Sequence, residues 1–218
     1  METIQPAGFL ALPSANIGHP VLVLHAWWGL NETIKTFCSR LAAAGFVAFA
    51  PDLYQGALAD QIEEAHKLSR QFSQKEAEIN QQLDEAIQFL KGYSQSEEAG
   101  ITVIGFSFGA YFALELSTTK PESIRSVIVF YGTGPRDFSA SKSSYLGHFA
   151  DQDEYEPQSE VDALRAALEQ AGRPAEIYQY ANTGHWFFEA DRSDAYQAEA
   201  AELAWERSLT FLKEQAAQ

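Results

Sequence analysis

Short runs of consecutive apolar residues alternate along the chain with longer stretches of helical pattern. Continuous apolar runs of about four to eight residues are typical of strands buried on both faces of a parallel sheet. The longer stretches mix apolar and polar positions as amphipathic helices do. The pattern predicts strands at 19–25, 46–50, 101–104, 124–131, 145–150 and 176–180, and helices at 31–44, 108–117, 157–171 and 195–215.

Residues that start and stop helices support this division. Asn31 is a predicted N-cap, and Gly45 is placed to end the same helix. The segment 59–92 is helical in composition and predicts two helices that are broken near Ser73. Such alternation predicts an α/β fold, with a mostly parallel central sheet and helices on both faces. Because no repeat, low-complexity linker or composition break interrupts the chain, we expect residues 1–218 to form one domain.

Composition and charge narrow the classes of partner. A chain of 218 residues can bury a substantial core, and its formal net charge of −15 disfavours nucleic acid and anionic membrane surfaces. The single Cys38 excludes an internal disulfide and Cys-pair metal motifs, and its neighbours indicate a buried, small apolar residue. The N-terminus lacks the pattern of a signal peptide, and no apolar stretch approaches the roughly 18 residues of a membrane span. We therefore expect a cytoplasmic protein, and a monomer.

The strongest chemical signal lies at 101–109, where an apolar strand runs into Gly105-Phe106-Ser107-Phe108-Gly109 and then into a helix. This is the G-x-S-x-G pattern of a nucleophile elbow, in its required context between strand and helix. A sharp strand-to-helix turn exposes its middle residue at a strained backbone angle and needs small flanking residues. Ser107 is therefore the candidate nucleophile. The alternative is a glycine-rich turn with a capping serine.

A serine hydroxyl needs an adjacent base, and in this fold class the chain order is Ser, then Asp or Glu, then His. Only His148 and His185 follow Ser107. His148 lies inside an apolar strand pattern, which favours a packed structural histidine. His185 lies in N-T-G-H-W-F-F, just after the strand at 176–180, where Gly184 would let the loop turn close to the sheet. We favour His185 as the general base over a plain loop histidine.

The acid should follow the strand at 145–150, where the sequence is D-Q-D-E-Y-E-P. Most carboxylates of such a run are solvated surface groups. Asp153 is the preferred acid because it falls in the loop, and Asp151 is the second choice. Its role would be to accept the Nδ1–H of His185, fix the tautomer and stabilise the imidazolium.

An oxyanion hole needs two N–H donors. The backbone N–H of Phe108 and that of Trp27, in H-A-W-W-G-L-N, are the candidates. Trp28 and Trp186 are candidate substrate-contacting residues. Trp27 and Trp28 are adjacent in sequence, and core packing of one of these two is an equal alternative. His25 precedes Ser107 and breaks the triad order, which leaves it a structural role or one in shaping the oxyanion loop.

The order of these motifs resembles the dienelactone hydrolase family of α/β-hydrolases. The resemblance is carried by H-A-W-W-G-L-N, L-A-A-A-G-F-V-A-F-A-P-D-L-Y, G-F-S-F-G, G-H-F-A-D-Q-D-E-Y-E-P and N-T-G-H-W-F-F, and it covers nearly the whole chain. It implies the α/β-hydrolase fold and hydrolysis of a small ester or lactone, with no metal or organic cofactor. It also supports Asp153 over Asp151, His185 as the base, and the backbone at Trp27 and Phe108 as oxyanion donors.

Two departures from the family pattern concern the nucleophile. The best-known members carry a cysteine where this chain has Ser107, and a glutamate where it has Ala26. The two changes are consistent, because a carboxylate with a pKa of about 4 can help to handle a thiol of pKa about 8.5 but can hardly ionise an alcohol. A serine at this position must therefore rely on His185.

Further departures concern the substrate. The same best-known members bind the substrate carboxylate with two arginines and a tyrosine, and the matching positions here are Ile62, His66 and Glu189. Arg192 is close enough in sequence to His185 to substitute, so it is a candidate substrate-binding residue. With the net charge of −15, these changes predict neutral or aromatic esters rather than acidic lactones.

The sequence thus predicts a serine esterase or lactonase with a small-molecule substrate. Two alternatives stay open. One is a thioesterase or peptidase with the same triad, because sequence does not separate acyl-transfer substrates. The other is a non-catalytic ligand-binding protein on a hydrolase scaffold, although such a protein need not keep all of Ser107, Asp153 and His185.

Overall fold

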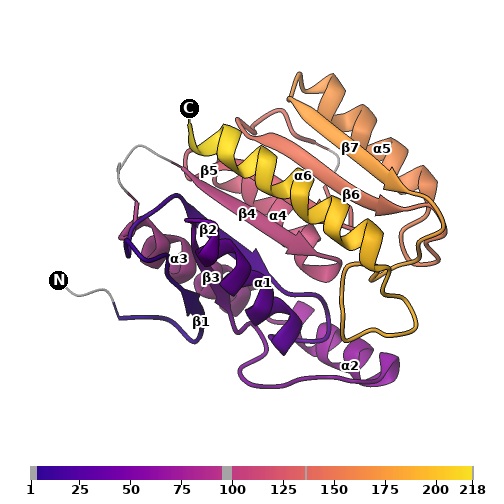
Figure 1. Ribbon diagram of the computed structural model, residues 1–218, viewed down its shortest axis with the longest axis horizontal. Helices are drawn as coiled ribbons and strands as arrows, with labels where there is room; N and C mark the ends of the chain where they lie inside the picture. Colours follow the sequence, from indigo (N-terminus) through magenta and orange to yellow (C-terminus); the bar gives the residue numbers. More distant parts are fainter. Residues whose placement is uncertain (1–3, 95–99, 136, 218) are drawn as a thin grey trace. The chain divides into compact units, whose positions relative to one another are not determined.

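The computed structural model describes residues 4–94, 100–135 and 137–217. The chain forms two compact units, divided between Val103 and Ile104 (Figure 1). The expectation of a single domain stays a prediction. The strand β4 (Ile101–Phe106) has residues in both units.

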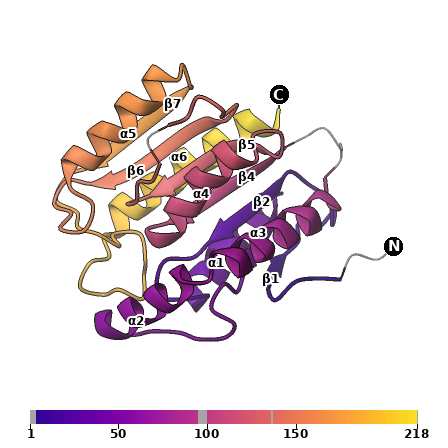
Figure 2. The ribbon, with the colours of Figure 1, turned by 180° about the vertical axis from the view of Figure 1, so that it is seen from behind.

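The first unit holds three strands in the order β1-β3-β2. The strand β2 runs parallel to β3, and β1 runs antiparallel to β3. Figures 1 and 2 show α1 on one face of these strands and α3 on the other. The bounds are Gly8–Ala11 for β1, Pro20–Leu24 for β2, Val47–Pro51 for β3, Glu32–Ala43 for α1, Ile62–Ser73 for α2 and Glu76–Lys91 for α3.

The second unit holds the end of β4 and three further strands, in the order β4-β5-β6-β7. The strands β5, β6 and β7 are parallel. Helix α6, in yellow, covers one face of these strands, and α4 and α5 cover the other (Figures 1 and 2). The bounds are Ile124–Phe130 for β5, Ser144–Ala150 for β6, Ala175–Tyr180 for β7, Phe108–Thr119 for α4, Gln158–Gln170 for α5 and Ala198–Ala216 for α6.

The expected α/β fold is confirmed: the described residues form seven strands of a mostly parallel sheet, and in each unit helices lie on both faces of the strands. Asn31 caps α1, and its side-chain oxygen accepts a hydrogen bond from the Ile34 N–H at 3.1 Å. Gly45 has φ +98°, the left-handed conformation of a helix stop. The segment at 59–92 is broken after Ser73, as predicted.

The strand β1 was not predicted. It has only four residues, and only the last of them, Ala11, is buried. Its pairing with β3 runs from Gly8 opposite Pro51 to Ala11 opposite Ala48. A strand this short carries too little periodicity to be seen in sequence, and its partner strand supplies the hydrogen bonds that define it.

None of the helices in the described part of the chain is long and apolar enough to span a membrane.

Candidate active site

Ser107 lies at a sharp turn between β4 and α4. Its backbone is at φ 48° and ψ −111°, a strained conformation for a residue with a side chain. The Ser107 N–H donates to the Phe130 carbonyl at 2.9 Å, which fixes the turn against the end of β5. A Cβ atom at Gly105 would lie 2.4 Å from the Gly109 carbonyl oxygen. The small residue expected beside the elbow is therefore required by the close approach of strand and helix.

The structure brings Ser107, His185 and Asp153 together in a hydrogen-bonded chain. The Ser107 Oγ lies 2.8 Å from His185 Nε2. The other ring nitrogen, Nδ1, lies 2.7 Å from Asp153 Oδ2 and 2.9 Å from Oδ1. The side chains of His185 and Asp153 are 5% and 3% exposed, so the pair is shielded from water. Nδ1–H donates to the carboxylate, which leaves the Nε2 lone pair directed at the serine hydroxyl.

Asp153 is oriented by its own loop. Its Oδ1 accepts hydrogen bonds from the backbone N–H groups of Tyr155 and Glu156, both at 2.9 Å. Asp151 instead accepts from the Thr183 N–H at 3.1 Å and is exposed. Of the two candidates for the acid, the structure therefore places Asp153 at the imidazole.

Glu156 is a neighbour of the triad that sequence reasoning missed. Its two carboxylate oxygens accept from the Thr133 N–H at 3.0 Å and from the Thr133 hydroxyl at 2.7 Å. Partial burial raises the pKa of Glu156, and the two Thr133 hydrogen bonds oppose this rise. The side chain ties the loop of Asp153 to the loop after β5. Within an acidic run that predicts solvated side chains, no signal in the sequence distinguishes it.

The residues directly after β5 are a second feature that sequence reasoning missed. Tyr131 has φ 38°, and its ring centroid lies 4.9 Å from that of His185. A Cβ atom at Gly132 would lie 2.6 Å from the Ser107 carbonyl oxygen, so only glycine fits beside the elbow. The two glycines in Y-G-T-G-P, which follow the strand, were the available signal.

The candidate oxyanion donors lie in different units. Phe108 is the first residue of α4, so its N–H stands at the positive end of the helix, directly after Ser107. Trp27 belongs to the first unit, where its ring contacts those of Trp28 at 5.4 Å and His66 at 4.6 Å between centroids. Trp28 is 2% exposed and packs in that unit. The roles of Trp27, Trp28 and Phe108 toward a substrate stay predictions.

The loop after β7 positions His185 differently from the expectation. Gly184 is not left-handed, and a Cβ atom there would meet only the Gln152 carbonyl oxygen at 3.6 Å. The left-handed residues are Asn182, with φ 57°, and Trp186, with φ 65°. The left-handed conformations of this loop are thus at Asn182 and Trp186, and position 184 has room for a side chain.

Two candidate substrate residues also lie in this loop. The Trp186 ring is edge-on to His185, with centroids 4.9 Å apart, and is 7% exposed. An Arg192 guanidinium nitrogen lies 3.4 Å from an Asp191 carboxylate oxygen. Contact of either residue with a substrate stays a prediction.

Two further histidines, His148 and His25, and the single cysteine, Cys38, are buried in structural positions. His148 Nδ1 lies 2.8 Å from the Tyr180 hydroxyl and Nε2 lies 2.9 Å from the Ser208 hydroxyl. Burial lowers the pKa of His148 to about 3, so the ring is neutral. His25 donates from Nδ1 to the Ala26 carbonyl at 2.7 Å, and burial lowers its pKa. Burial raises the pKa of the Cys38 thiol, which keeps it protonated.

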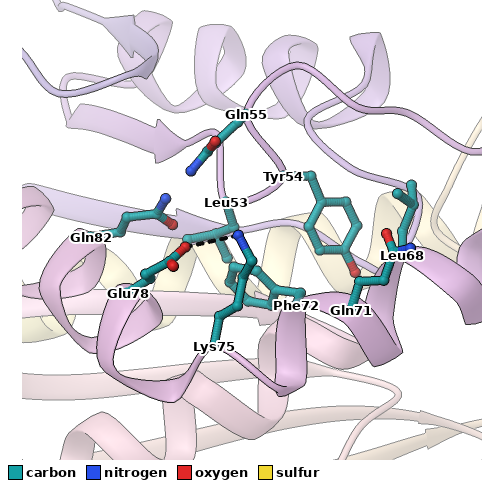
Figure 3. A pocket seen from close by; sticks show the side chains of 9 residues that line it. All are labelled: Leu53, Tyr54, Gln55, Leu68, Gln71, Phe72, Lys75, Glu78 and Gln82. Atoms are coloured by element: carbon teal, nitrogen blue, oxygen red, sulfur yellow. Dashed lines mark hydrogen bonds and ion pairs between the residues drawn. The ribbon is translucent and has the colours of Figure 1, made fainter.

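Other places in the described chain offer no comparable chemistry. Among the residues that the structure describes, no three His, Cys, Asp or Glu side chains are grouped as a metal ion would require. The first unit holds a cavity of about 120 Å³ (Figure 3). The residue lining includes Tyr54, Phe72 and the ion pair between Lys75 and Glu78, whose atoms are 2.9 Å apart. None of the site residues predicted from sequence lines it.

Comparison with known proteins identifies the family. A model of the dienelactone hydrolase family matches residues 7–216. The chain belongs to the dienelactone hydrolase family. A protein of Aquifex aeolicus named "Putative carboxymethylenebutenolidase" is 31% identical over 219 residues, which cover 96% of this chain and 94% of that protein. "Protein usf" of Aquifex pyrophilus is 30% identical over 221 residues, covering 97% and 94%.

Solved structures similar to this chain share its fold. A crystal structure described as a "Putative Dienelactone Hydrolase" of Klebsiella pneumoniae is 25% identical, with a TM-score of 0.76 over 88% of this chain and 86% of that one. A dienelactone hydrolase-like promiscuous phosphotriesterase, P91 from metagenomic libraries, has a TM-score of 0.80 over 91% and 87%, at 21% identity. This dienelactone hydrolase family member is thus an α/β-hydrolase and, as expected, an enzyme that hydrolyses ester bonds.

Proposed function

We propose that the protein is a serine hydrolase that cleaves a small carboxylic ester or lactone through an acyl-enzyme intermediate. The observation that carries this proposal is the unbroken set of short contacts from Ser107 Oγ to His185 and from His185 to Asp153. A non-catalytic binding protein would have no need of this alignment, nor of the strained backbone at the serine.

The geometry supports the following reaction. The Ser107 Oγ attacks the ester carbonyl carbon while its proton passes to His185 Nε2, and the Asp153 carboxylate stabilises the imidazolium. The developing oxyanion is stabilised by the N-terminus of α4, with the Phe108 N–H as one donor. His185 then protonates the leaving alcohol as the C–O bond breaks. Water, deprotonated by His185, then attacks the acyl carbon, and His185 passes that proton to Ser107 Oγ as the bond between the acyl carbon and Oγ breaks, which releases the acid and free Ser107.

We propose neutral or aromatic esters as the substrate class. Glu189, at the position of a family arginine, is fully buried and so cannot reach a bound substrate in the described conformation. Ile62 and His66 stand at the positions of the other two residues that bind the substrate carboxylate in those relatives, and both are exposed on the first unit. The net charge of −15 also disfavours an anionic substrate.

Active-site labelling tests the triad directly. We expect a fluorophosphonate probe to form an adduct on Ser107, located by mass spectrometry of the digested protein. The variant His185→Ala should label at least about a hundredfold more slowly, because general base catalysis supplies about that factor or more. Ser39→Ala, which removes an exposed hydroxyl on α1, is the matched control and should label at the wild-type rate. An adduct on another serine, or equal labelling of His185→Ala, would contradict the assignment.

A substrate panel tests the class. We expect p-nitrophenyl esters of short neutral acids to be cleaved with a higher kcat/KM than acidic lactones, acyl-CoA thioesters or peptides. A clear preference for a dienelactone over simple aryl esters would show that other residues, Arg192 among them, bind the substrate carboxylate. A preference for thioesters or peptides would favour those alternative activities of the same triad.

A further inference from the structure

Glu189 is a fully buried carboxyl group in the loop that carries His185. It lies four residues after His185 and has 0% of its surface exposed. Its Oε1 accepts a hydrogen bond from the Tyr131 hydroxyl at 2.9 Å. Its Oε2 is buried and has no hydrogen-bond partner among the described residues. A carboxyl group with only one satisfied oxygen in such a place calls for an explanation.

Tyr131 connects this carboxyl group to the site. Its N–H donates to the His148 carbonyl at 2.7 Å, which holds the residue at the end of β5. One neighbour of the buried Tyr131 ring is the His185 ring, with centroids 4.9 Å apart, and another is Phe187, at 5.6 Å. The Tyr131 ring is therefore packed between the strand and the loop that carries the base, and Glu189 holds its hydroxyl end.

We propose that Glu189 in its protonated form is a positioning residue, which acts through Tyr131 to hold the loop of His185 in the reactive geometry. This inference rests on the proposed serine hydrolase function, because it assigns His185 as the base. Glu189 does not touch the reacting atoms. Its backbone also takes part in the hydrogen bonds of the loop: the Glu189 N–H donates to the Trp186 carbonyl, and the Glu189 carbonyl accepts from the Arg192 N–H, both at 2.9 Å.

The groups around Glu189 favour the protonated form at neutral pH. Burial is the largest cause and, with Asp191, raises the pKa of Glu189 to about 8, while the Tyr131 hydrogen bond and Arg192 oppose the rise. Burial, followed by the neighbouring Glu189, Asp191 and Asp153, holds the pKa of Tyr131 well above its usual value. Tyr131 therefore stays a hydrogen-bond donor throughout the range in which Glu189 titrates.

Loss of the Glu189 proton would strain this arrangement. A buried carboxylate with one donor is poorly solvated, and a charge in that position is strongly unfavourable. The charge can be relieved by water reaching Oε2, which requires the loop from His185 to Arg192 to move. Because His185 is part of that loop, the distance from its Nε2 to the Ser107 hydroxyl would lengthen, and turnover would fall.

The test is the pH profile of kcat for a neutral aryl ester between pH 6 and pH 10. We expect wild-type kcat to decline above about pH 8, approaching tenfold for each further pH unit. Glu189→Gln cannot ionise and should lack this decline. Tyr131→Phe removes the bond that lowers the pKa of Glu189, so the decline should move to higher pH. Asp191→Asn removes a charge that raises the pKa of Glu189, so the decline should move to lower pH.

These directions separate a positioning role from a merely structural one. A structural defect would lower kcat at every pH and would leave the midpoint of the decline in place. Asp191→Asn alters an exposed residue, so it keeps the test decisive if the two core variants do not fold. If the wild type hydrolyses esters but the midpoint of the decline in kcat stays the same in a folded variant, the role of Glu189 alone would be overturned. A wild type that neither labels at Ser107 nor hydrolyses any ester would overturn the proposed function and this inference with it.

Discussion

At the scale of single residues, the site is marked by backbone strain. Ser107, Tyr131 and Trp186 all have positive φ, and none is a glycine. Such conformations cost on the order of 1–3 kcal/mol each and persist only where the surroundings impose them. Here each one fixes a group around the imidazole: the nucleophile, the ring packed on His185, or the residue that follows it.

The carboxylate at position 153 gives a sharp residue-scale prediction. We expect Asp153→Asn to lower kcat by on the order of 10³–10⁴-fold, because an amide can donate to Nδ1 and hold the wrong imidazole tautomer. The fold should be retained, since the amide oxygen can still accept from the N–H groups of Tyr155 and Glu156. Steady-state kinetics with an aryl ester, together with circular dichroism, checks both points.

Asp151→Asn is the matched control, with the same chemical change two residues earlier. Asp151 is exposed and contacts the Thr183 N–H rather than His185. Its kcat should stay within a few fold of wild type. If Asp151→Asn were the damaging change and Asp153→Asn were mild, the second candidate from the sequence would be the true acid.

At the scale of elements, α1 shows how well a local pattern predicts structure. The Asn31 side chain accepts from the Ile34 N–H, one of the donors that a helix start leaves without an intrahelical partner. We expect Asn31→Ala to reduce the free energy of unfolding by about 1 kcal/mol, and Asn31→Asp to retain most of it. Urea denaturation measures both. Equal losses in the two variants would show that the cap bond is not the source.

Local patterns explain which parts of the site could be predicted. Ser107, Asp153 and His185 each follow a strand whose pattern is clear, and the chain order of such fold classes links them. Glu156 and Glu189 could not be predicted, because their burial depends on Thr133 and Tyr131, which are distant in sequence. A carboxylate in an acidic or loop segment indicates a solvated surface unless the tertiary contact is known.

At the scale of the whole molecule, the sheet brings distant residues together. Ser107 and His185 are 78 positions apart, and each lies just after a strand of the second unit. Parallel strands end at the same edge, so the groups after β4, β6 and β7 meet there. The same packing buries His148 and Glu189 in surroundings that favour their neutral forms, which makes the stability of the fold depend on pH.

His148 makes the fold less stable at acid pH. The Ser208 hydroxyl donates to the Ala204 carbonyl, so it accepts from His148 Nε2–H, and Nδ1 accepts from the Tyr180 hydroxyl. A protonated ring would lose the second bond and carry a buried charge. The folded pKa of about 3 lies below the unfolded value of 6.5. Stability from this group is therefore complete above pH 6.5 and is lost as the pH falls toward 3.

Glu189 changes the stability of the fold with pH in the opposite direction. Its folded pKa of about 8 lies above the unfolded value of 4.5, so its contribution is complete below pH 4.5 and is lost as the pH rises through 8. Each group alone changes the free energy of unfolding by at most about 1.4 kcal/mol per pH unit within its window. Between pH 4.5 and 6.5 the two slopes oppose one another, and we expect the stability curve of the wild type to be flattest there.

Urea denaturation from pH 4 to pH 9 checks both signs with one pair of variants. Glu189→Gln should lose the decline in stability between pH 6.5 and 8 and keep the acid-side loss. His148→Gln should be less stable overall, because two buried hydrogen bonds are disturbed, yet its stability should depend less on pH below 6.5. Parallel curves for wild type and Glu189→Gln above pH 6.5 would mean that the buried carboxyl group is already ionised at neutral pH. The alkaline loss of kcat would then need another cause, and Glu189 would hold Tyr131 as a carboxylate.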